Sequence, residues 1–186
     1  ATAALNGGTY TSLRTAQSAF DALADYKDSA EKAKESRYVY AEKQFAAGEW
    51  EQAIAYYEQT PGYQEADAKI TLCHYNRAMD LMEAQEYQDA REKFLNLGNY
   101  QDSATNAQEC LYQPAMKAME TGDNLLAIDY FKQLGEYRDS TLKLQMAYYA
   151  AADQYFAEAD YDTAAEYYLL AGDYSDAFRR ATGCLY

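Results

Sequence analysis

The stretch Tyr100-Gln101-Asp102-Ser103 returns along the chain at a fixed spacing. Each copy begins with a tyrosine that lies 37 residues after the one before it. A fixed period between about 20 and 50 residues is typical of stacked repeat arrays, in which each unit packs mainly on its neighbours. The spacing therefore predicts a repeat protein without one central core. The other copies are Tyr26-Lys27-Asp28-Ser29, Tyr63-Gln64-Glu65-Ala66, Tyr137-Arg138-Asp139-Ser140 and Tyr174-Ser175-Asp176-Ala177.

Each repeat carries the start and stop signals of two helices. Asp28 followed by Glu31 is typical of a capping box, and Gly48 suits the residue after a helix because glycine tolerates positive φ. Pro61 ends the second helix, since proline cannot continue the hydrogen-bond ladder. No alternation of apolar and polar residues predicts a strand. We expect a long helix A at about 28–47, 65–84, 102–121 and 139–158, a truncated one from about 176, and a shorter helix B at about 9–23, 50–59, 87–97, 124–134 and 161–171.

The repeats also define the expected domain organisation. The chain is predicted to be all-α, a single solenoid of stacked antiparallel helix hairpins over residues 1–186. It comprises a lead-in and half-repeat at 1–25, repeats at about 26–62, 63–99, 100–136 and 137–173, and a truncated half-repeat at 174–186. Because the chain starts at Ala1 without a methionine and both ends cut the repeat, we expect a fragment or a processed product.

Two columns of the repeat hold only alanine. Small residues at both places allow the two helices of a hairpin to approach closely. The columns are Ala16, Ala53, Ala90, Ala127 and Ala164 in helix B, and Ala41, Ala78, Ala115 and Ala152 in helix A. Four residues after each helix-B alanine stands an aromatic residue that we expect to fill the space beside the neighbouring unit: Phe20, Tyr57, Phe94, Phe131 and Tyr168.

Helix B resembles part of a known family. The residues Gly48-Glu49-Trp50-Glu51-Gln52-Ala53-Ile54-Ala55-Tyr56-Tyr57 resemble the second-helix signature of tetratricopeptide (TPR) repeats, G-[DE]-[YW]-x-x-A-[IL]-x-x-[YF]. Further copies begin at Gln85, Gly122 and Ala159, and the one at Gly122 has Asn124 in place of the aromatic residue. The resemblance covers nearly the whole chain. It implies a right-handed α-solenoid whose concave face binds a protein or a peptide.

Two features depart from that family. TPR repeats have about 34 residues, whereas these have 37, and we interpret the additional residues as a longer start of helix A. Pro114 lies well inside the third helix A, where proline costs about 3 kcal/mol and kinks a helix. We therefore expect a bend or a break around Cys110–Gln113.

Composition argues against several classes of partner. The chain has 30 acidic and 16 basic side chains, a formal net charge of -14. This charge argues against nucleic acid, whose binding proteins need basic patches, and against an anionic membrane surface. No apolar run of about 18 residues predicts a membrane span. A basic partner is compatible with this charge, although a solvated acidic surface explains it more simply.

The sequence lacks the residue patterns of an enzyme or a metalloprotein. No metal-ligand spacing, glycine-rich phosphate loop or nucleophile–base pair is present, so we expect no catalytic residue, metal or cofactor. His74 shares its column with Arg37 and Leu111, so it is expected to be a partly buried packing residue. The cysteines Cys73, Cys110 and Cys184 share another column and should lie about one repeat apart, too far for disulfides.

Tyrosine is the outlier in composition, with 21 residues. One column is wholly tyrosine: Tyr38, Tyr75, Tyr112, Tyr149 and Tyr186. In TPR-like arrays the equivalent position faces the peptide groove, and tyrosine and methionine both suit binding surfaces. The alternative, which stays open, is that these tyrosines pack between successive A helices. The resemblance implies a groove lined by Tyr38, Glu42, Tyr75, Met79, Tyr112, Met116, Tyr149 and Asp153.

Two functions follow from these patterns. The first is a non-enzymatic protein- or peptide-binding scaffold, which the TPR resemblance implies. The second is an exported or cell-surface bacterial module that binds glycan or cell-wall polymer, or that acts only as a spacer. Free thiols slightly favour the cytoplasm, and the flanking sequence would distinguish the two.

Overall fold

The protein is described by a computed structural model that places residues 10–23 and 28–185. All regular structure in these residues is α-helical, with no strand, which confirms the all-α prediction. The predicted lead-in 1–8, the turn at Tyr26-Lys27 and Tyr186 lie outside the described residues. The chain divides into two compact units, unit 1 (Ala1–Glu83) and unit 2 (Ala84–Tyr186). The single array over 1–186 stays a prediction.

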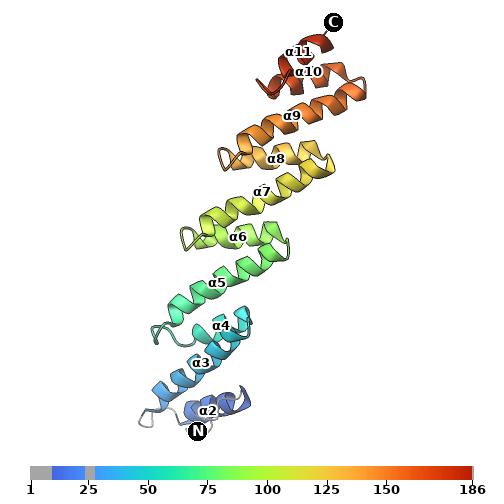
Figure 1. The fold of residues 1–186 in the computed structure, drawn as a ribbon. Coiled ribbons are helices and arrows are strands. Elements are labelled where there is room, and N and C mark those ends of the chain that lie inside the picture. The colour runs from blue at the N-terminus through green and yellow to red at the C-terminus, as the bar shows by residue number, and fades with distance from the viewer. Residues whose placement is uncertain (1–9, 24–27, 186) are drawn as a thin grey trace. The chain divides into compact units, whose positions relative to one another are not determined.

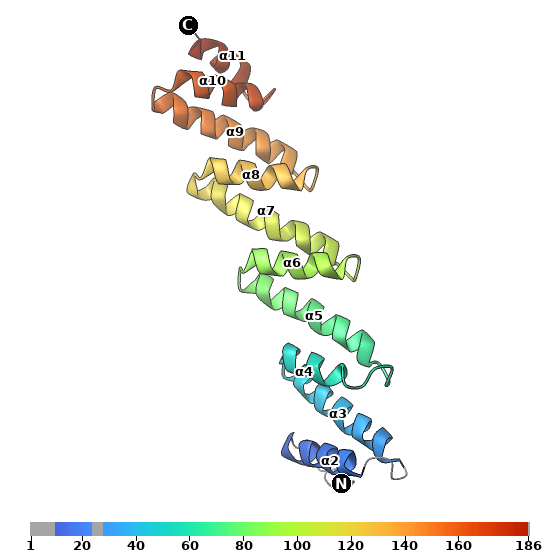
Figure 2. The same ribbon diagram turned by 180° about the vertical axis from the view of Figure 1, so that it is seen from behind.

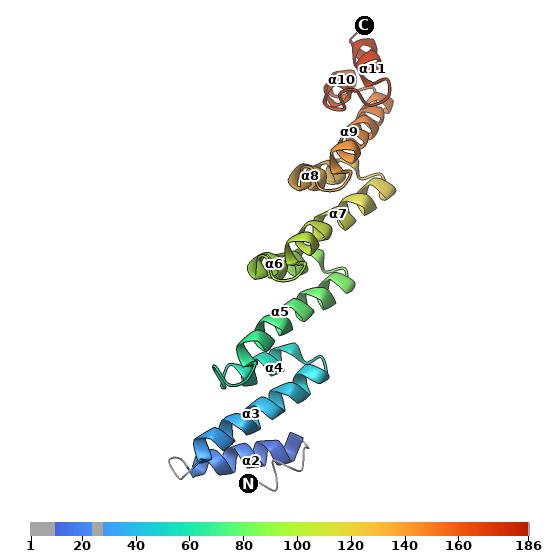
Figure 3. The same ribbon diagram turned by 60° about the vertical axis from the view of Figure 1, so that its left-hand side comes forward.

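Within each unit, extensive contacts join helices that are adjacent in the sequence. Because short turns connect them, successive helices run in opposite directions, and long and short helices alternate (Figure 1). Views from behind and from the side show the same order inside unit 2 (Figures 2 and 3). Unit 1 contains α2 (Tyr10–Ala22), α3 (Ser29–Ala46), α4 (Trp50–Tyr57) and α5 (Ala66–Glu83). Unit 2 contains α6 (Tyr87–Leu97), α7 (Ser103–Thr121), α8 (Asn124–Leu134), α9 (Ser140–Ala157), α10 (Tyr161–Leu170) and α11 (Ala177–Cys184).

The two alanine columns belong to the buried core of both units. Every alanine of both columns is 0% exposed, as expected for sites of close helix approach. Phe94 and Phe131 are also fully buried, four residues after their alanines, and Phe20 is 6% exposed. A side chain larger than alanine at either column would separate the helices of its hairpin.

Helix α7 passes through Pro114 without interruption. It runs from Ser103 to Thr121, so the predicted break at Cys110–Gln113 is absent. The physical reason is packing: α7 contacts both α6 and α8, and Ala115 and Ala118 beside the proline are buried. These contacts hold the helix together although proline removes one of its hydrogen bonds.

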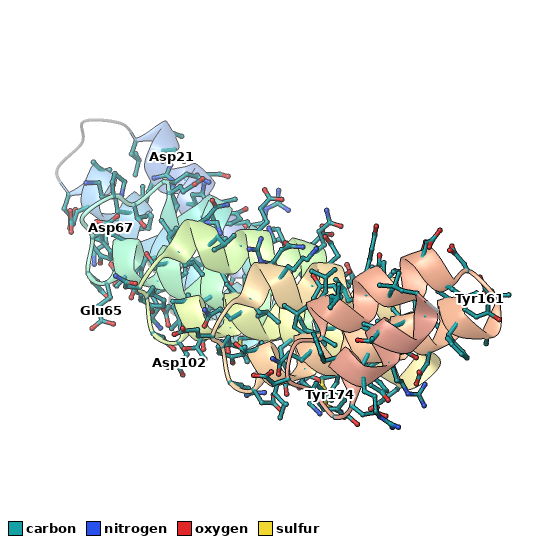
Figure 4. The ribbon with its side chains drawn as sticks, turned by 90° about the horizontal axis from the view of Figure 1, so that it is seen from above. Asp21, Glu65, Asp67, Asp102, Tyr161 and Tyr174 are labelled. Carbon is teal, nitrogen blue, oxygen red and sulfur yellow. The ribbon has the colours of Figure 1, made fainter. Side chains whose placement is uncertain are left out.

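The recurrent four-residue stretch forms the turn between each helix B and the next helix A. Its fourth backbone N–H donates to its tyrosine carbonyl, at 3.0 Å in both Tyr100–Ser103 and Tyr137–Ser140. The second residue has a positive φ, 45° at Gln101 and 51° at Arg138. The fourth residue is buried in every described copy, which explains why only serine or alanine stands there. Figure 4 shows Asp102 and Tyr174, from two of these turns, along one edge of unit 2.

The aspartate of this turn starts helix A differently from the prediction. The backbone carbonyl of Asp102 accepts a hydrogen bond from Asn106 N–H at 2.8 Å. Its side chain makes no capping bond, and neither does that of Asp28, so the predicted capping box is wrong. Asp102 has φ -93° and ψ 18°, outside the extended region typical of capping side chains. A side-chain cap occurs instead on helix B, where Asp123 accepts from Leu126 N–H.

The turn between helices A and B of unit 2 provides a test of stability. Gly122 has φ 79° after α7, and Ala159 has φ 64° at the equivalent place after α9. This region costs an L residue about 1–2 kcal/mol, while glycine loses more entropy on folding. Ala159→Gly is therefore expected to raise the free energy of unfolding by about 1 kcal/mol in denaturant titrations.

Gly122→Ala is the matched control and should lower stability by a similar amount. A Cβ at this position would meet Gln154 Nε2 at 3.9 Å, which is ordinary contact, so the cost is conformational. Equal or lower stability of Ala159→Gly would contradict the left-handed conformation of this residue.

Candidate functional site

The tyrosines of the predicted groove connect one helix A to the turn before the next. In unit 2 the Tyr112 hydroxyl donates to Asp139 Oδ1 at 2.6 Å. The Tyr149 hydroxyl donates to Asp176 Oδ1, also at 2.6 Å. Both aspartates belong to the recurrent turn. Each tyrosine therefore ties its own helix to the residue that starts the following helix A.

The rings of these tyrosines are packed as well. Tyr112 meets Phe131 of α8 and Tyr137 of the next turn edge to face, with ring centroids 6.2 and 5.9 Å apart. One repeat later, the Tyr149 ring meets the equivalent residues Tyr168 and Tyr174 edge to face, with ring centroids 5.3 and 5.5 Å apart. Edge-to-face pairs are favourable by about 0.5–1.5 kcal/mol beyond their burial. The column thus contributes to stability through both ring and hydroxyl.

In unit 1 the two tyrosines of the column differ in exposure. Tyr38 is 8% exposed, and its ring lies edge to face with Tyr57 and Tyr63, 5.5 Å from each. Tyr75 is half-buried on α5. Tyr38 is therefore a packing residue, whereas Tyr75, Tyr112 and Tyr149 retain some accessible surface.

Glu42, a predicted groove residue, lies in a polar network between three helices. Its Oε1 accepts from the Tyr57 hydroxyl of α4 at 2.6 Å. Lys69 Nζ of α5 lies 3.2 Å from the same oxygen and 4.5 Å from the Phe45 ring centroid. Burial is the main cause of the raised Tyr57 pKa, and the bond to Glu42 adds to it. Glu42 is thus engaged within unit 1.

Asp153 has the same three-part arrangement in unit 2. It accepts hydrogen bonds from Tyr168 of α10 and from Arg180 of α11, and Arg180 Nη1 lies 2.7 Å from Oδ1. Arg180 Nη1 also donates to the Tyr168 hydroxyl at 2.9 Å. Burial, followed by the bond to Asp153, raises the pKa of Tyr168 to about 12. The tyrosine therefore stays neutral near pH 7 and acts as a hydrogen-bond donor to the carboxylate.

The methionines of the predicted groove mark a matched exchange along the sequence. Glu42 and Asp153 of helix A are each hydrogen-bonded to a helix-B tyrosine 15 residues later, Tyr57 and Tyr168. Where helix A has Met79 or Met116, the corresponding helix-B residue is phenylalanine. Met116 packs against the core cluster of unit 2 that contains Phe131. At these two positions, a carboxylate–tyrosine pair in one repeat is therefore replaced by a methionine–phenylalanine pair in another.

The hydroxyl–carboxylate bonds raise the pKa of the tyrosines. The hydrogen bond to Asp139 raises the pKa of Tyr112 to about 12, and burial adds to it. A bond to Asp176 raises the pKa of Tyr149 in the same way. Conversely, the Tyr149 hydroxyl is the largest cause that lowers the pKa of Asp176.

Sequence reasoning missed a buried carboxylate on α7. Glu109 is 8% exposed, accepts from the Tyr137 hydroxyl at 2.8 Å and pairs with Arg138 Nη1 at 2.9 Å. Arg138 also lies 5.0 Å from the Tyr112 ring centroid. These contacts hold the turn before α9. The equivalent residue of the next repeat is Met146, and a carboxylate in a column that also holds methionine was the available signal.

The histidine and the cysteines singled out in the sequence occupy separate places in the structure. His74 is exposed, so the prediction of a partly buried packing residue is wrong. Cys73, Cys110 and Cys184 are free, as predicted, and burial raises the pKa of Cys73 and Cys110 to about 11. In residues 10–23 and 28–185 no His, Cys, Asp and Glu groups are arranged to hold a metal ion. None of the described helices has the length and apolar character needed to cross a bilayer.

Comparison with known proteins gives no family assignment. No protein-family model matches the chain, and no curated protein matches it. The TPR resemblance therefore depends on the helix-B motif and the alanine columns alone.

The Tyr112–Asp139 bond predicts a pH-dependent contribution to stability. Tyr112→Phe removes the hydroxyl and is expected to lower the free energy of unfolding by about 0.5–1 kcal/mol at pH 7, a modest loss because the pair is partly solvent-exposed. The Tyr112 pKa is raised from 10.0 to about 12. The contribution is therefore complete below pH 10 and is lost as pH rises through 12.

Denaturant melts of wild type and Tyr112→Phe between pH 7 and 12 measure this difference. Tyr174→Phe is the control, because the described part of the chain shows no hydrogen bond from the Tyr174 hydroxyl. A stability difference for Tyr112→Phe that does not change with pH would contradict the bond.

The polar network of Asp153 predicts strong coupling between two substitutions. Asp153→Met leaves the buried Tyr168 hydroxyl without its carboxylate and should cost about 1–3 kcal/mol, and Tyr168→Phe alone should cost about 1 kcal/mol. The double variant recreates the pair found at Met116 and Phe131, so its loss should be smaller than the sum by about 1 kcal/mol. A double-mutant cycle from denaturant unfolding measures this coupling. Additive losses would show that the two residues act independently.

Proposed function

We propose that the chain is a non-enzymatic protein- or peptide-binding scaffold built as a right-handed, TPR-like α-solenoid. Three features support this reading: the 37-residue period, the packing of sequence-adjacent helices inside each unit, and the alanine columns at every hairpin. In such an architecture the A helices offer one extended face to a ligand.

The observation that carries the proposal is the partial exposure of aromatic and methionine side chains on the A helices. In unit 2 these are Tyr112, Met116 and Tyr149, and in unit 1 they are Tyr75 and Met79, which is 38% exposed. The hydroxyls of Tyr112 and Tyr149 are already bound to aspartates. Recognition on this face would therefore depend on ring faces and methionine side chains.

The net charge adds a preference for basic ligands. Glu42 and Asp153 are already paired with Lys69 and Arg180, so they are not free to bind a ligand charge directly. The overall charge of -14 would act at longer range, by raising the encounter rate of basic segments. Affinity on this proposal comes mainly from apolar contact, and its dependence on salt should be modest.

A peptide-display selection against the purified chain, followed by calorimetry on the selected peptides, tests the proposal. Met116→Ala and Met79→Ala, assayed separately, should each weaken a peptide that engages its unit by at least about 5-fold, or about 1 kcal/mol. Leu125→Ala on α8 is the matched control, because it also removes an exposed apolar side chain (47% exposed) but from a helix B. The Leu125→Ala variant should bind the selected peptides with unchanged affinity.

Two results would contradict the proposal. One is failure to select any peptide that binds with a dissociation constant below about 1 mM. The other is a set of peptides whose affinity falls with Leu125→Ala and not with either methionine variant. Binding of glycan in place of peptide would favour the cell-surface function.

A further inference from the structure

A groove in unit 2 lies between two neighbouring B helices, α6 and α8. Its floor is one face of α7, formed by Leu111, Pro114 and Ala118, and its walls include Tyr87 and Tyr130. Its two parts have cavity volumes of about 360 and 300 Å³ and share Pro114 and both tyrosines. Sites for small ligands begin at about this size.

This groove is distinct from the tyrosine and methionine surface of the A helices. Leu111, Pro114 and Ala118 follow one another at spacings of three and four, so they lie along one face of α7. Tyr112 and Met116 fall on another face of the same helix. A ligand in the groove would therefore contact the B helices.

The next repeat shows what fills the equivalent space. Between α8 and α10, the Tyr155 and Tyr148 rings lie 5.2 and 6.0 Å from the Tyr167 ring. The residues that replace Tyr148 and Tyr155 in the groove are Leu111 and Ala118. The groove thus exists because two tyrosine side chains of one repeat are exchanged for smaller ones in the repeat before it.

One wall of the groove also carries an unmatched donor. Arg91 of α6 occupies a column that holds Gln17, Ile54, Ile128 and Ala165 in the other helices B, and the last two are buried. The Arg91 Nε–H is buried and has no hydrogen-bond partner among the described residues. Arg91 also lines the groove, and its guanidinium carries further N–H donors that an acceptor on a ligand could engage.

We propose that this groove binds a tyrosine side chain presented by a partner peptide. Its ring lies between Tyr87 and Tyr130 over Pro114, and its phenolic oxygen accepts a hydrogen bond from the Arg91 guanidinium. Tyr148 and Tyr155 provide the internal precedent for a phenol in this space. The inference rests on the proposed peptide-binding function and adds a second site to it, apart from Tyr112 and Met116. A failure of p-cresol to bind would count against the groove and not against the surface of Tyr112 and Met116.

The first test uses p-cresol, which is the tyrosine side chain as a free molecule. Titrated into the isotope-labelled full chain, it should shift the amide NMR signals of Tyr87, Arg91 and Tyr130, with a dissociation constant on the order of 1 mM. Toluene, which lacks the acceptor, should bind at least about 3-fold more weakly. In Arg91→Met the two probes should bind equally. N-acetyl-tyrosine amide should shift the same signals as p-cresol.

Two reciprocal variants provide the decisive controls. Ala118→Tyr installs the side chain of the next repeat and should abolish the p-cresol shifts at Tyr130. Tyr155→Ala opens the corresponding space and should create new shifts at Tyr167. Shifts that persist in Ala118→Tyr, or that spread evenly along the chain, would overturn the proposal. If Ala118→Tyr does not fold, an absence of new shifts in Tyr155→Ala overturns it.

Discussion

A hydrogen bond from a helix-A tyrosine to the aspartate of the following turn is the interaction on which the arrangement of unit 2 depends. It joins Tyr112 to Asp139 and Tyr149 to Asp176, in each case across 27 residues. A single inserted residue between the partners would move the donor away from its acceptor. The bond therefore constrains the number of residues between helix A and the next turn in these two repeats. It also explains why the turn keeps an acidic residue whose side chain does not cap its own helix.

The same bonds limit what the tyrosine surface can do. A hydroxyl that donates to a carboxylate inside the protein is less available to a ligand, so the column offers mainly ring faces. Glu42 and Asp153 are restrained in the same way by a tyrosine and a cation. The proposed recognition surface of the A helices is therefore largely apolar, although the net charge of the chain is strongly negative.

Helix positions could be predicted because their signals are local. Gly98 and Gly135 end helices B with positive φ, and the alanine columns identify the buried faces. The break at Pro114 was wrongly predicted, since the continuity of α7 depends on helices that pack from both sides. The partner of Asp139 was missed because a turn aspartate can cap its own helix or accept a bond from a distant tyrosine, and only the backbone angles decide between them.

The joint exchange of polar and apolar residues in two columns indicates a contact between them. Considering each column alone does not reveal this contact. Tyr168 with Asp153, and Phe131 with Met116, differ together. Two columns that change as a pair indicate contact, even without related sequences. The groove between α6 and α8 could not be predicted from the sequence, because a cavity depends on how the volumes of several side chains fill the space between helices.

The most direct measurement of the tyrosine–aspartate link is a carbon-13 NMR titration of the aspartate side chains. Asp176 should titrate below the ordinary range for aspartate, because the Tyr149 hydroxyl and then Arg179 stabilise its charged form. In Tyr149→Phe its pKa should move back toward the ordinary value, because the largest stabilising contact of the charged form is lost. An Asp176 pKa that is the same in the two proteins would contradict the hydrogen bond that connects the repeats.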